Sequence, residues 1–332
     1  MMRTRHWARS VVLGIGLTVV SGCTLGRDLA RARLADGDAA LRQRNIDAAL
    51  VEFREAVKLD PQLAEAHYKL GLAYKEKGAL DDAATSLQEA VKLDPKNATP
   101  IIELGDVYRL LNRITQAIRA YTMARDLEPR NFDIRFRLAT LYHQSGDLEK
   151  AVEAYEDAIR VEPRNAYARS NLGAALAALG RDYDAIKAYK DSLECNQAQP
   201  VVLVNLATVY INQERWDTAQ RALNVALSMD PKLSVAHERL GYCLWRRQSY
   251  AAAAEHYEKA IELDPKNAAA YAGYGVVLMT QHLEQPDNLD LRHRAVEAWH
   301  SSLELNSNQP KLRELVDKYR PRFEPPALTL DK

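Results

Sequence analysis

The sequence has no excess charge of either sign and little of the glycine and proline that break helices. It contains 332 residues, with 45 basic and 45 acidic side chains, 14 glycines and 13 prolines. A balanced charge gives no indication of the basic surface typical of a nucleic-acid-binding protein. Hydrophobic residues make up 47% of the chain and aromatic residues only 7%. This composition favours well-packed helices over disorder.

Motifs of the common enzyme classes are also missing. The chain lacks a phosphate-binding glycine loop, a G-x-S-x-G elbow and an H-E-x-x-H sequence. Its histidines, including His67 and His237, show no ligand spacing. We therefore expect no catalysis, no cofactor and no metal. We expect Cys195 and Cys243 to be small buried hydrophobes, although a disulfide between them remains an alternative.

The apolar run at residues 11–20 is too short to span a bilayer, which needs about 20 residues. Basic residues precede the run, and Val20-Ser21-Gly22-Cys23 follow it. This order resembles the signal peptide and lipobox of bacterial lipoproteins. The resemblance implies a signal peptide at 1–22, cleavage before Cys23, and attachment of lipid, including palmitate, to that residue. An uncleaved anchor, or an ordinary signal peptide with a chance cysteine, is the alternative.

Thr24 follows the predicted lipidation site, where lipoproteins retained in the inner membrane have aspartate. The resemblance therefore implies the outer membrane, facing the periplasm. Without residues 1–22, the chain has three more acidic than basic side chains. We expect the lipid, and not surface charge, to anchor the protein to the membrane.

A period of 34 residues dominates the rest of the chain. Prolines recur at this spacing, with one doubled step, and each follows a similar sequence such as AVKLDP or AIELDP; they stand at 61, 95, 129, 163, 231 and 265. Within one 34-residue repeat, Leu104, Gly105 and Tyr108 precede Ala117, Tyr121 and Ala124, and similar residues stand at the same positions of other repeats. Since proline cannot continue a helix, each proline is expected just beyond the end of one.

Both the period and these residues resemble the tetratricopeptide repeat. The resemblance implies an all-α fold, a right-handed α-solenoid superhelix of about eight helix-turn-helix units with a C-terminal cap helix. Residues 23–29 would form a short linker, 309–320 the cap helix, and 321–332 a flexible tail. The repeats would occupy 30–308, with an insertion near 285–293, and they would start near 30, 64, 98, 132, 166, 200, 234 and 268.

Glycine within a helix costs about 0.5–1 kcal/mol relative to alanine, so the recurring mid-helix glycines need a packing reason. We expect close approach between paired helices at Gly71, Gly105, Gly173, Gly241 and Gly275. A small alanine at the facing position of the second helix would serve the same contact.

The first helix of each repeat is the usual peptide-binding surface in this family. At its sixth position lie Lys69, Glu103, Arg137, Asn171, Asn205 and Arg239. The last four form a polar ladder that could bind peptide amides or a carboxylate. It resembles part of a carboxylate clamp and asparagine ladder, although Val235 stands where the full clamp has lysine. Candidate apolar anchors are Phe136, Tyr167, Val201, Val204, Tyr242 and Trp245; each side chain could equally belong to a solvated surface.

The sequence therefore predicts a non-catalytic scaffold that binds other proteins or peptides and is held at a membrane by its lipid. Relatives with this layout include pilotins of type IV pilus secretins and adaptors for peptidoglycan hydrolases and proteases. Two alternatives remain. Similar repeats precede O-linked glycosyltransferase domains, but only 25 residues follow Ser307. The repeats could also bind a second copy and form a homo-oligomer.

Overall fold

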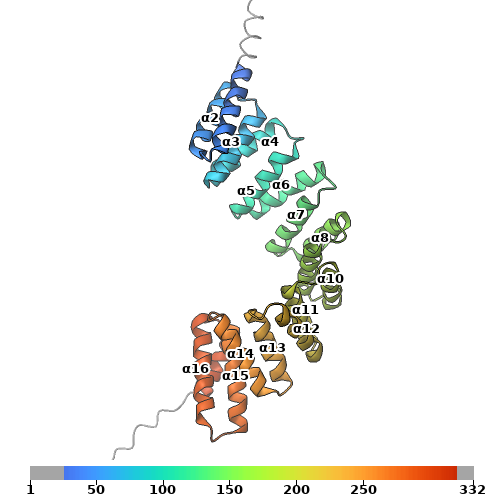
Figure 1. Cartoon of the computed structure of the whole chain (residues 1–332), viewed down its shortest axis with the longest axis vertical. Helices are drawn as coiled ribbons and strands as arrows, with labels where there is room; N and C mark the ends of the chain where they lie inside the picture. Colours follow the sequence, from blue (N-terminus) through green and yellow to red (C-terminus); the bar gives the residue numbers. More distant parts are fainter. Residues whose placement is uncertain (1–25, 320–332) are drawn as a thin grey trace, which may run out of the picture. The chain divides into compact units, whose positions relative to one another are not determined.

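The computed structural model describes residues 26–319, which form only helices and connecting turns. The predicted lipidation site at Cys23 and the predicted tail at 321–332 lie outside these residues. The described chain forms two compact units that divide after Pro163. Within each unit, consecutive helices pair and stack, so the predicted all-α solenoid is confirmed (Figure 1).

The first unit contains a helix at residues 26–42 and seven further helices. These are α2 (Ile46–Leu59), α3 (Ala64–Lys77), α4 (Leu80–Leu93), α5 (Ala98–Leu110), α6 (Ile114–Leu127), α7 (Phe132–Ser145) and α8 (Leu148–Val161). The strongest contacts join α3 to α4, α5 to α6, and α7 to α8. Each pair thus corresponds to one period of the sequence.

The second unit continues the pairing. Its helices are α9 (Ala166–Ala178), α10 (Asp182–Cys195), α11 (Pro200–Asn212), α12 (Trp216–Met229), α13 (Ser234–Arg246), α14 (Tyr250–Leu263), α15 (Ala268–Glu284), α16 (Leu289–Leu305) and α17 (Pro310–Tyr319). The first helices of successive pairs also contact one another, α9 with α11, α11 with α13, and α13 with α15. They therefore form one continuous face.

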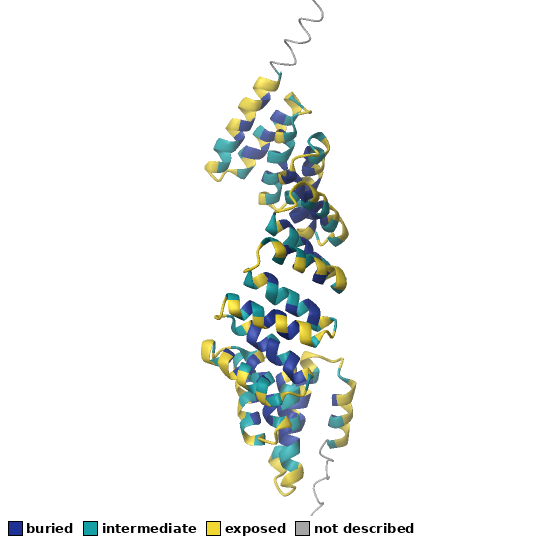
Figure 2. Cartoon of the chain, turned by 90° about the vertical axis from the view of Figure 1, so that its right-hand side faces the viewer, coloured by how far each residue is buried: buried dark blue, intermediate teal, exposed yellow. Residues whose placement is uncertain are grey.

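Small residues let the paired helices approach closely, as predicted. A Cβ atom added to Gly105 would lie 3.0 Å from Cζ of Tyr121, and one added to Gly173 would lie 2.8 Å from the Tyr189 ring. The alanines expected to face these contacts, among them Ala117 and Ala151, are fully buried. Figure 2 shows the buried residues in dark blue on the facing sides of the helices.

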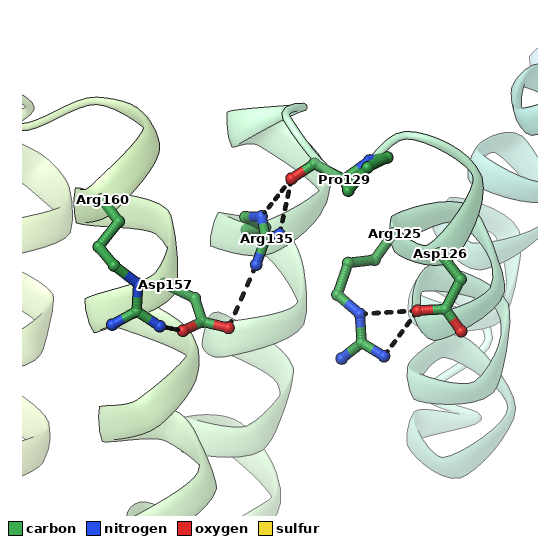
Figure 3. Close-up of polar contacts among 6 residues, drawn as sticks. All are labelled: Arg125, Asp126, Pro129, Arg135, Asp157 and Arg160. Atoms are coloured by element: carbon green, nitrogen blue, oxygen red, sulfur yellow. Dashed lines mark hydrogen bonds and ion pairs between the residues drawn. The ribbon is translucent and has the colours of Figure 1, made fainter.

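The prolines lie in the turns between pairs, and at Pro61, Pro129 and Pro231 the fourth residue of the next helix binds the proline carbonyl. His67 Nε2 lies 3.0 Å from the Pro61 oxygen, and Arg135 Nε donates to the Pro129 oxygen at 2.9 Å. Figure 3 shows Arg135 also bonded to Asp157 of α8, whose carboxylate Arg160 shares. The turn is thus tied to both helices that follow it.

The turn within each pair needs one residue in the left-handed conformation. These residues recur every 34 positions and have φ between 56° and 82°: Arg44, Gly78, Asn112, Gly146, Gly180, Glu214 and Gln248. Only three of them are glycine, although this conformation strains other residue types. The next position in the series, His282, is helical.

The eighth pair therefore differs from the prediction. An insertion at 285–293 was expected in the loop, but only residues 285–288 lie outside helices. The extra residues lengthen the helices, so that α15 and α16 have 17 residues each. This extension is possible because the chain does not turn at His282. Beyond the pair, α17 buries Leu312 and Val316.

We predict that Gly146→Ala lowers the free energy of unfolding by about 1 kcal/mol, because alanine resists the left-handed conformation. A Cβ atom at Gly146 would meet no atom within 4 Å, so backbone strain is the only cost. Urea unfolding followed by circular dichroism would measure the loss. The matched control is Gln248→Ala, which keeps a non-glycine residue in the same conformation and should change stability by less than about 0.5 kcal/mol. An equal loss in both variants would contradict the prediction.

Candidate functional site

The four residues of the predicted ladder all occupy the sixth position of a first helix, but they fall into different units. Arg137 lies on α7 of the first unit. Asn171, Asn205 and Arg239 lie on α9, α11 and α13 of the second unit, whose helices contact in that order. The structure thus brings three ladder residues onto one face and leaves Arg137 in the other unit.

Arg137 belongs to an internal polar network. Its guanidinium binds the Asp106 carboxylate of α5, which also accepts a hydrogen bond of 2.7 Å from the Tyr121 hydroxyl. Asp106 is buried, at 8% exposure. Burial, followed by the Asp106 contact, raises the pKa of Tyr121, which therefore stays a neutral donor. Arg137 consequently neutralises a buried carboxylate, a structural role that the ladder hypothesis did not foresee.

The two asparagines are half-buried and lack such partners. Among residues 26–319, neither the Asn171 nor the Asn205 side chain has a hydrogen-bond partner. A side-chain amide offers two donors and an acceptor. These amides are therefore available to a ligand that lies along the face.

Arg239 is only partly satisfied. One terminal nitrogen, Nη1, lies 3.4 Å from Glu238 Oε1, and Nε is buried with no partner in the described chain. Burial raises the pKa of Glu238, and Arg239 opposes this rise. The Glu238 side chain is only 9% exposed, whereas that of Arg239 is 38% exposed. The guanidinium can therefore reach a ligand that the carboxylate cannot.

The predicted apolar anchors also divide into two groups. Phe136 stacks on Phe132 at 5.6 Å between ring centroids and lies beside Tyr155, so it takes part in internal packing. Tyr167 is 71% exposed on α9, where it can meet a ligand. Val201 is 58% exposed and Val204 is 6% exposed. Only the first of these two valines can contribute to a surface.

Tyr242 and Trp245 form an aromatic cluster with Trp216, which sequence reasoning missed. The Tyr242 ring lies 5.9 Å from the rings of both tryptophans, and the Arg246 guanidinium lies 4.4 Å from the Trp216 ring. Trp216 is the first residue of α12, where other second helices begin with Leu, Ile, Asp or Tyr. The large Trp216 side chain at this position was the sequence signal that could have indicated the cluster.

A pair of histidines joins α13 to α14 beside this face. The Nδ1 atoms of His237 and His256 lie 2.9 Å apart, and His237 Nε2 lies 3.2 Å from the Pro231 carbonyl oxygen. Because a carbonyl can only accept, Nε2 of His237 carries the hydrogen and Nδ1 accepts from His256. Both ring nitrogens of His237 therefore have partners within the protein, so its position needs no ligand to account for it. Among residues 26–319, no group of three or more potential metal ligands occurs.

The two cysteines within residues 26–319, Cys195 and Cys243, are free thiols. Cys243 of α13 is fully buried and Cys195 of α10 is half-buried. Burial raises the pKa of Cys243 to about 11. For Cys243, the prediction of a small buried hydrophobe is confirmed.

No helix within residues 26–319 has both the length and the apolarity required to cross a membrane.

Comparison with known families and structures agrees with this architecture. A family profile described as Cilia and flagella-associated protein 70 C-terminal domain matches residues 102–273, which is more than half of the chain. Profiles of the TPR repeat and the tetratricopeptide repeat match residues 37–78 and 64–97. The chain belongs to the tetratricopeptide repeat family. No curated protein matches the sequence significantly.

Solved structures share the fold. A tetratricopeptide repeat protein from Parabacteroides merdae is 21% identical with a TM-score of 0.60, over 77% of this chain and 98% of that chain. PilF of Pseudomonas aeruginosa is 19% identical with a TM-score of 0.51, over 62% and 94% of the two chains. Folds of this family generally act as non-catalytic scaffolds that bind proteins or peptides.

We predict that Arg137→Ala lowers the free energy of unfolding by about 1–3 kcal/mol, because the buried Asp106 carboxylate loses its hydrogen-bonded cation. Within residues 26–319, the only cation that then remains near it is Arg109, with Nε 3.9 Å from Asp106 Oδ1. Asn171→Ala is the matched comparison at the same repeat position, and it should cost less than about 0.5 kcal/mol. Urea unfolding would measure both values. Equal effects of the two substitutions would show that the internal network does not stabilise the fold.

We expect protonation of His237 and His256 to lower the free energy of unfolding in acid. Burial lowers the pKa of His237; the hydrogen bond to the Pro231 carbonyl opposes this effect, and Lys259 adds to it. Burial also lowers the pKa of His256; His237 adds to this effect, and Glu255 opposes it. The unfolded chain therefore takes up protons first as the pH falls below 6.5, the ordinary histidine value. The contribution is fully present above this pH and is lost towards the lowered folded-state values.

We expect the urea midpoint of the wild-type chain to fall more between about pH 7.5 and 5.5 than that of a His237→Gln, His256→Gln double variant. The difference between the two proteins isolates the pair from all other titrating groups. A parallel fall in both proteins would contradict the assignment.

Proposed function

We propose that the protein is a non-catalytic adaptor of the bacterial cell envelope. Lipid on Cys23 anchors it to the outer membrane, facing the periplasm, and its repeats hold peptide segments of partner proteins. Such an adaptor would assist assembly of an envelope, pilus or secretion complex. The order of basic start, short apolar run and lipobox in the sequence supports the anchor.

One observation above all supports the binding role. On three successive first helices of the second unit, Asn171, Asn205 and Arg239 carry polar atoms that the described chain leaves unpaired. Buried or half-buried polar groups normally find partners. A peptide backbone supplies donors and acceptors along its whole length, so it can pair with all three residues at once.

The exposed side chains of the same unit support a protein partner as well. Aromatic and arginine side chains dominate the binding energy of many interfaces. Tyr167 is exposed, and Tyr242 and Trp245 lie on the same helix as Arg239. Because residues at positions i and i+3 of a helix are neighbours on its surface, Arg239 and Tyr242 can meet one ligand, and the Trp245 ring lies beside that of Tyr242.

We predict that replacing Asn171, Asn205 and Arg239 by alanine abolishes capture of the physiological partner. The lipidated wild-type chain and the triple variant would be purified from crosslinked envelopes, and the captured proteins compared by mass spectrometry. A secretion, pilus or cell-wall component captured only by the wild type supports the proposal. Unchanged capture would place the partner surface elsewhere, and capture of the chain itself alone would favour a homo-oligomer.

Cys23→Ser tests the anchor separately. We expect this variant to lose incorporation of labelled palmitate and to move from the membrane fraction to the soluble fraction. Cys195→Ser is the control, because it leaves the lipobox intact and should keep both properties. A Cys23→Ser chain that still carries label and stays with membranes would refute lipid attachment at this residue.

A further inference from the structure

The exposed second position of the first helices changes character between the two units. In the first unit it is polar, and in the second it is apolar. All of these residues are exposed, and at 58% and 49% Val201 and Val235 are among the most exposed aliphatic side chains described. The polar set comprises Glu65, Thr99 and Asp133; the apolar row comprises Tyr167, Val201, Val235 and Ala269.

Charges follow the same division. In the first unit, ion pairs join first helices to one another: Lys69 to Asp38 at 2.9 Å, Lys75 to Glu103 at 2.7 Å, and Arg137 to Asp106. Among the described residues of the second unit, no ion pair joins two first helices. The first unit thus satisfies its own polar groups across this face.

The second unit has few charges on this face. Helix α11 contains none, and α15 contains only Glu284 at its end. The single charged residue of α9, Arg169, pairs with Asp191 of α10 at 3.1 Å. A charged ligand side chain placed here would lose water without gaining a counter-charge, which is costly. An uncharged apolar ligand avoids this cost.

Arg239 and Arg246 of α13 are the exceptions. Arg246 stacks on Trp216 and lies 3.8 Å from Glu214, so its charge is already engaged. Within the described chain, Arg239 pairs only with the largely buried Glu238, at 3.4 Å between Nη1 and Oε1, and its Nε has no partner. This guanidinium is complementary to one carboxylate on a ligand.

The spacing of the apolar row selects a ligand conformation. Packed helices lie about 8–10 Å apart, and a polyproline II segment rises about 3.1 Å per residue with three residues per turn. Three residues therefore advance the ligand by one helix and return its side chain to the same face. A β-strand, which alternates every two residues, would turn alternate contacts away.

We propose that the first-helix face from α9 to α15 binds an extended segment of a partner protein that has an apolar side chain at every third residue and is uncharged apart from one carboxylate. The apolar side chains contact the apolar row, and the neighbouring amides of Asn171 and Asn205, four residues further along their helices, bind the ligand backbone. The carboxylate lies where the segment crosses α13 and pairs with Arg239. This inference rests on the proposed scaffold function and assigns ligand binding to the second unit.

The probe is a fluorescein-labelled twelve-residue peptide with valine at every third position, proline and serine between, and one glutamate. A second peptide has the same composition with the valines grouped together. Fluorescence anisotropy with the full chain should show at least about tenfold tighter binding of the spaced peptide, since several buried methyl groups depend on the spacing.

Val201→Lys and Val235→Lys place a charge in the apolar row at positions exposed enough to leave folding unchanged, which circular dichroism would check. Each should weaken binding of the spaced peptide about tenfold, because the lysine must be desolvated. Thr99→Lys is the matched control at the same repeat position of the first unit and should alter binding less than about twofold. Arg239→Gln should weaken the glutamate peptide but not its glutamine counterpart.

The other outcomes overturn the inference. Equal binding of the spaced and grouped peptides would exclude the three-residue spacing, and a loss with Thr99→Lys equal to that with Val201→Lys would exclude the second unit as the site. Self-association that Val201→Lys abolishes would identify a second copy as the occupant. Should the probe fail to bind while capture of an envelope partner still depends on Asn171, Asn205 and Arg239, the ligand chemistry is wrong and the scaffold function stands. If the probe fails to bind and the wild-type chain also captures no envelope partner, the scaffold function is refuted as well.

Discussion

The two helices of each repeat are held close because a glycine or alanine of the first helix faces a large side chain of the second. A Cβ atom on Gly241 would lie 3.0 Å from the Tyr257 ring, and one on Gly275 would lie 2.5 Å from Trp299. At such distances the neighbouring ring would have to move to accommodate the added Cβ atom. The ring therefore occupies the volume that a larger residue on the first helix would need, and interiors packed at this density leave it no other place.

This contact fixes the backbone while it leaves the opposite face of the first helix unconstrained. Leu240 and Gly241 face the partner helix and are buried, whereas Arg239 and Tyr242 are partly exposed. Each repeat can therefore vary its exposed side chains without changing how the helices pair. The two units use this freedom differently, one for ion pairs between helices and the other for an apolar row.

Much of the fold could be predicted because packing repeats every 34 residues and so leaves a periodic trace. Buried positions such as Ala117 and Tyr121 recur at the same offsets in other repeats. The partner of Arg137 could not be found in this way, because Asp106 has no counterpart at the same position of the neighbouring repeats. Trp216 is likewise unique to its repeat. Periodicity thus indicates the core, whereas contacts made by one repeat alone require the structure.

The eighth repeat was mispredicted for a related reason. Ala295 and Trp299 stand later in the eighth repeat than the corresponding alanine and large residue of the other repeats, and this shift correctly indicated extra residues. The shift alone does not say whether those residues lie in a loop or in the two helices. The missing left-handed residue at His282 decides this, since the helix continues where no residue reverses the chain. A turn position occupied by Arg44 or Glu214 carries no glycine signal, so sequence inspection could not recognise its absence at 282.

The choice of asparagine at the sixth position of α9 and α11 has a physical consequence for binding. An ionised side chain such as Arg137, once paired with a buried carboxylate, cannot be released to a ligand without leaving that carboxylate uncompensated. A neutral amide exchanges water for a peptide group at little net cost, because it loses and gains similar hydrogen bonds. Asn171 and Asn205 can therefore be solvated in the free protein and bonded in the complex, which a self-paired charge cannot. Under the proposed function, reversible binding would use the asparagine side chains of the second unit, which are neutral and have no hydrogen-bond partner within residues 26–319.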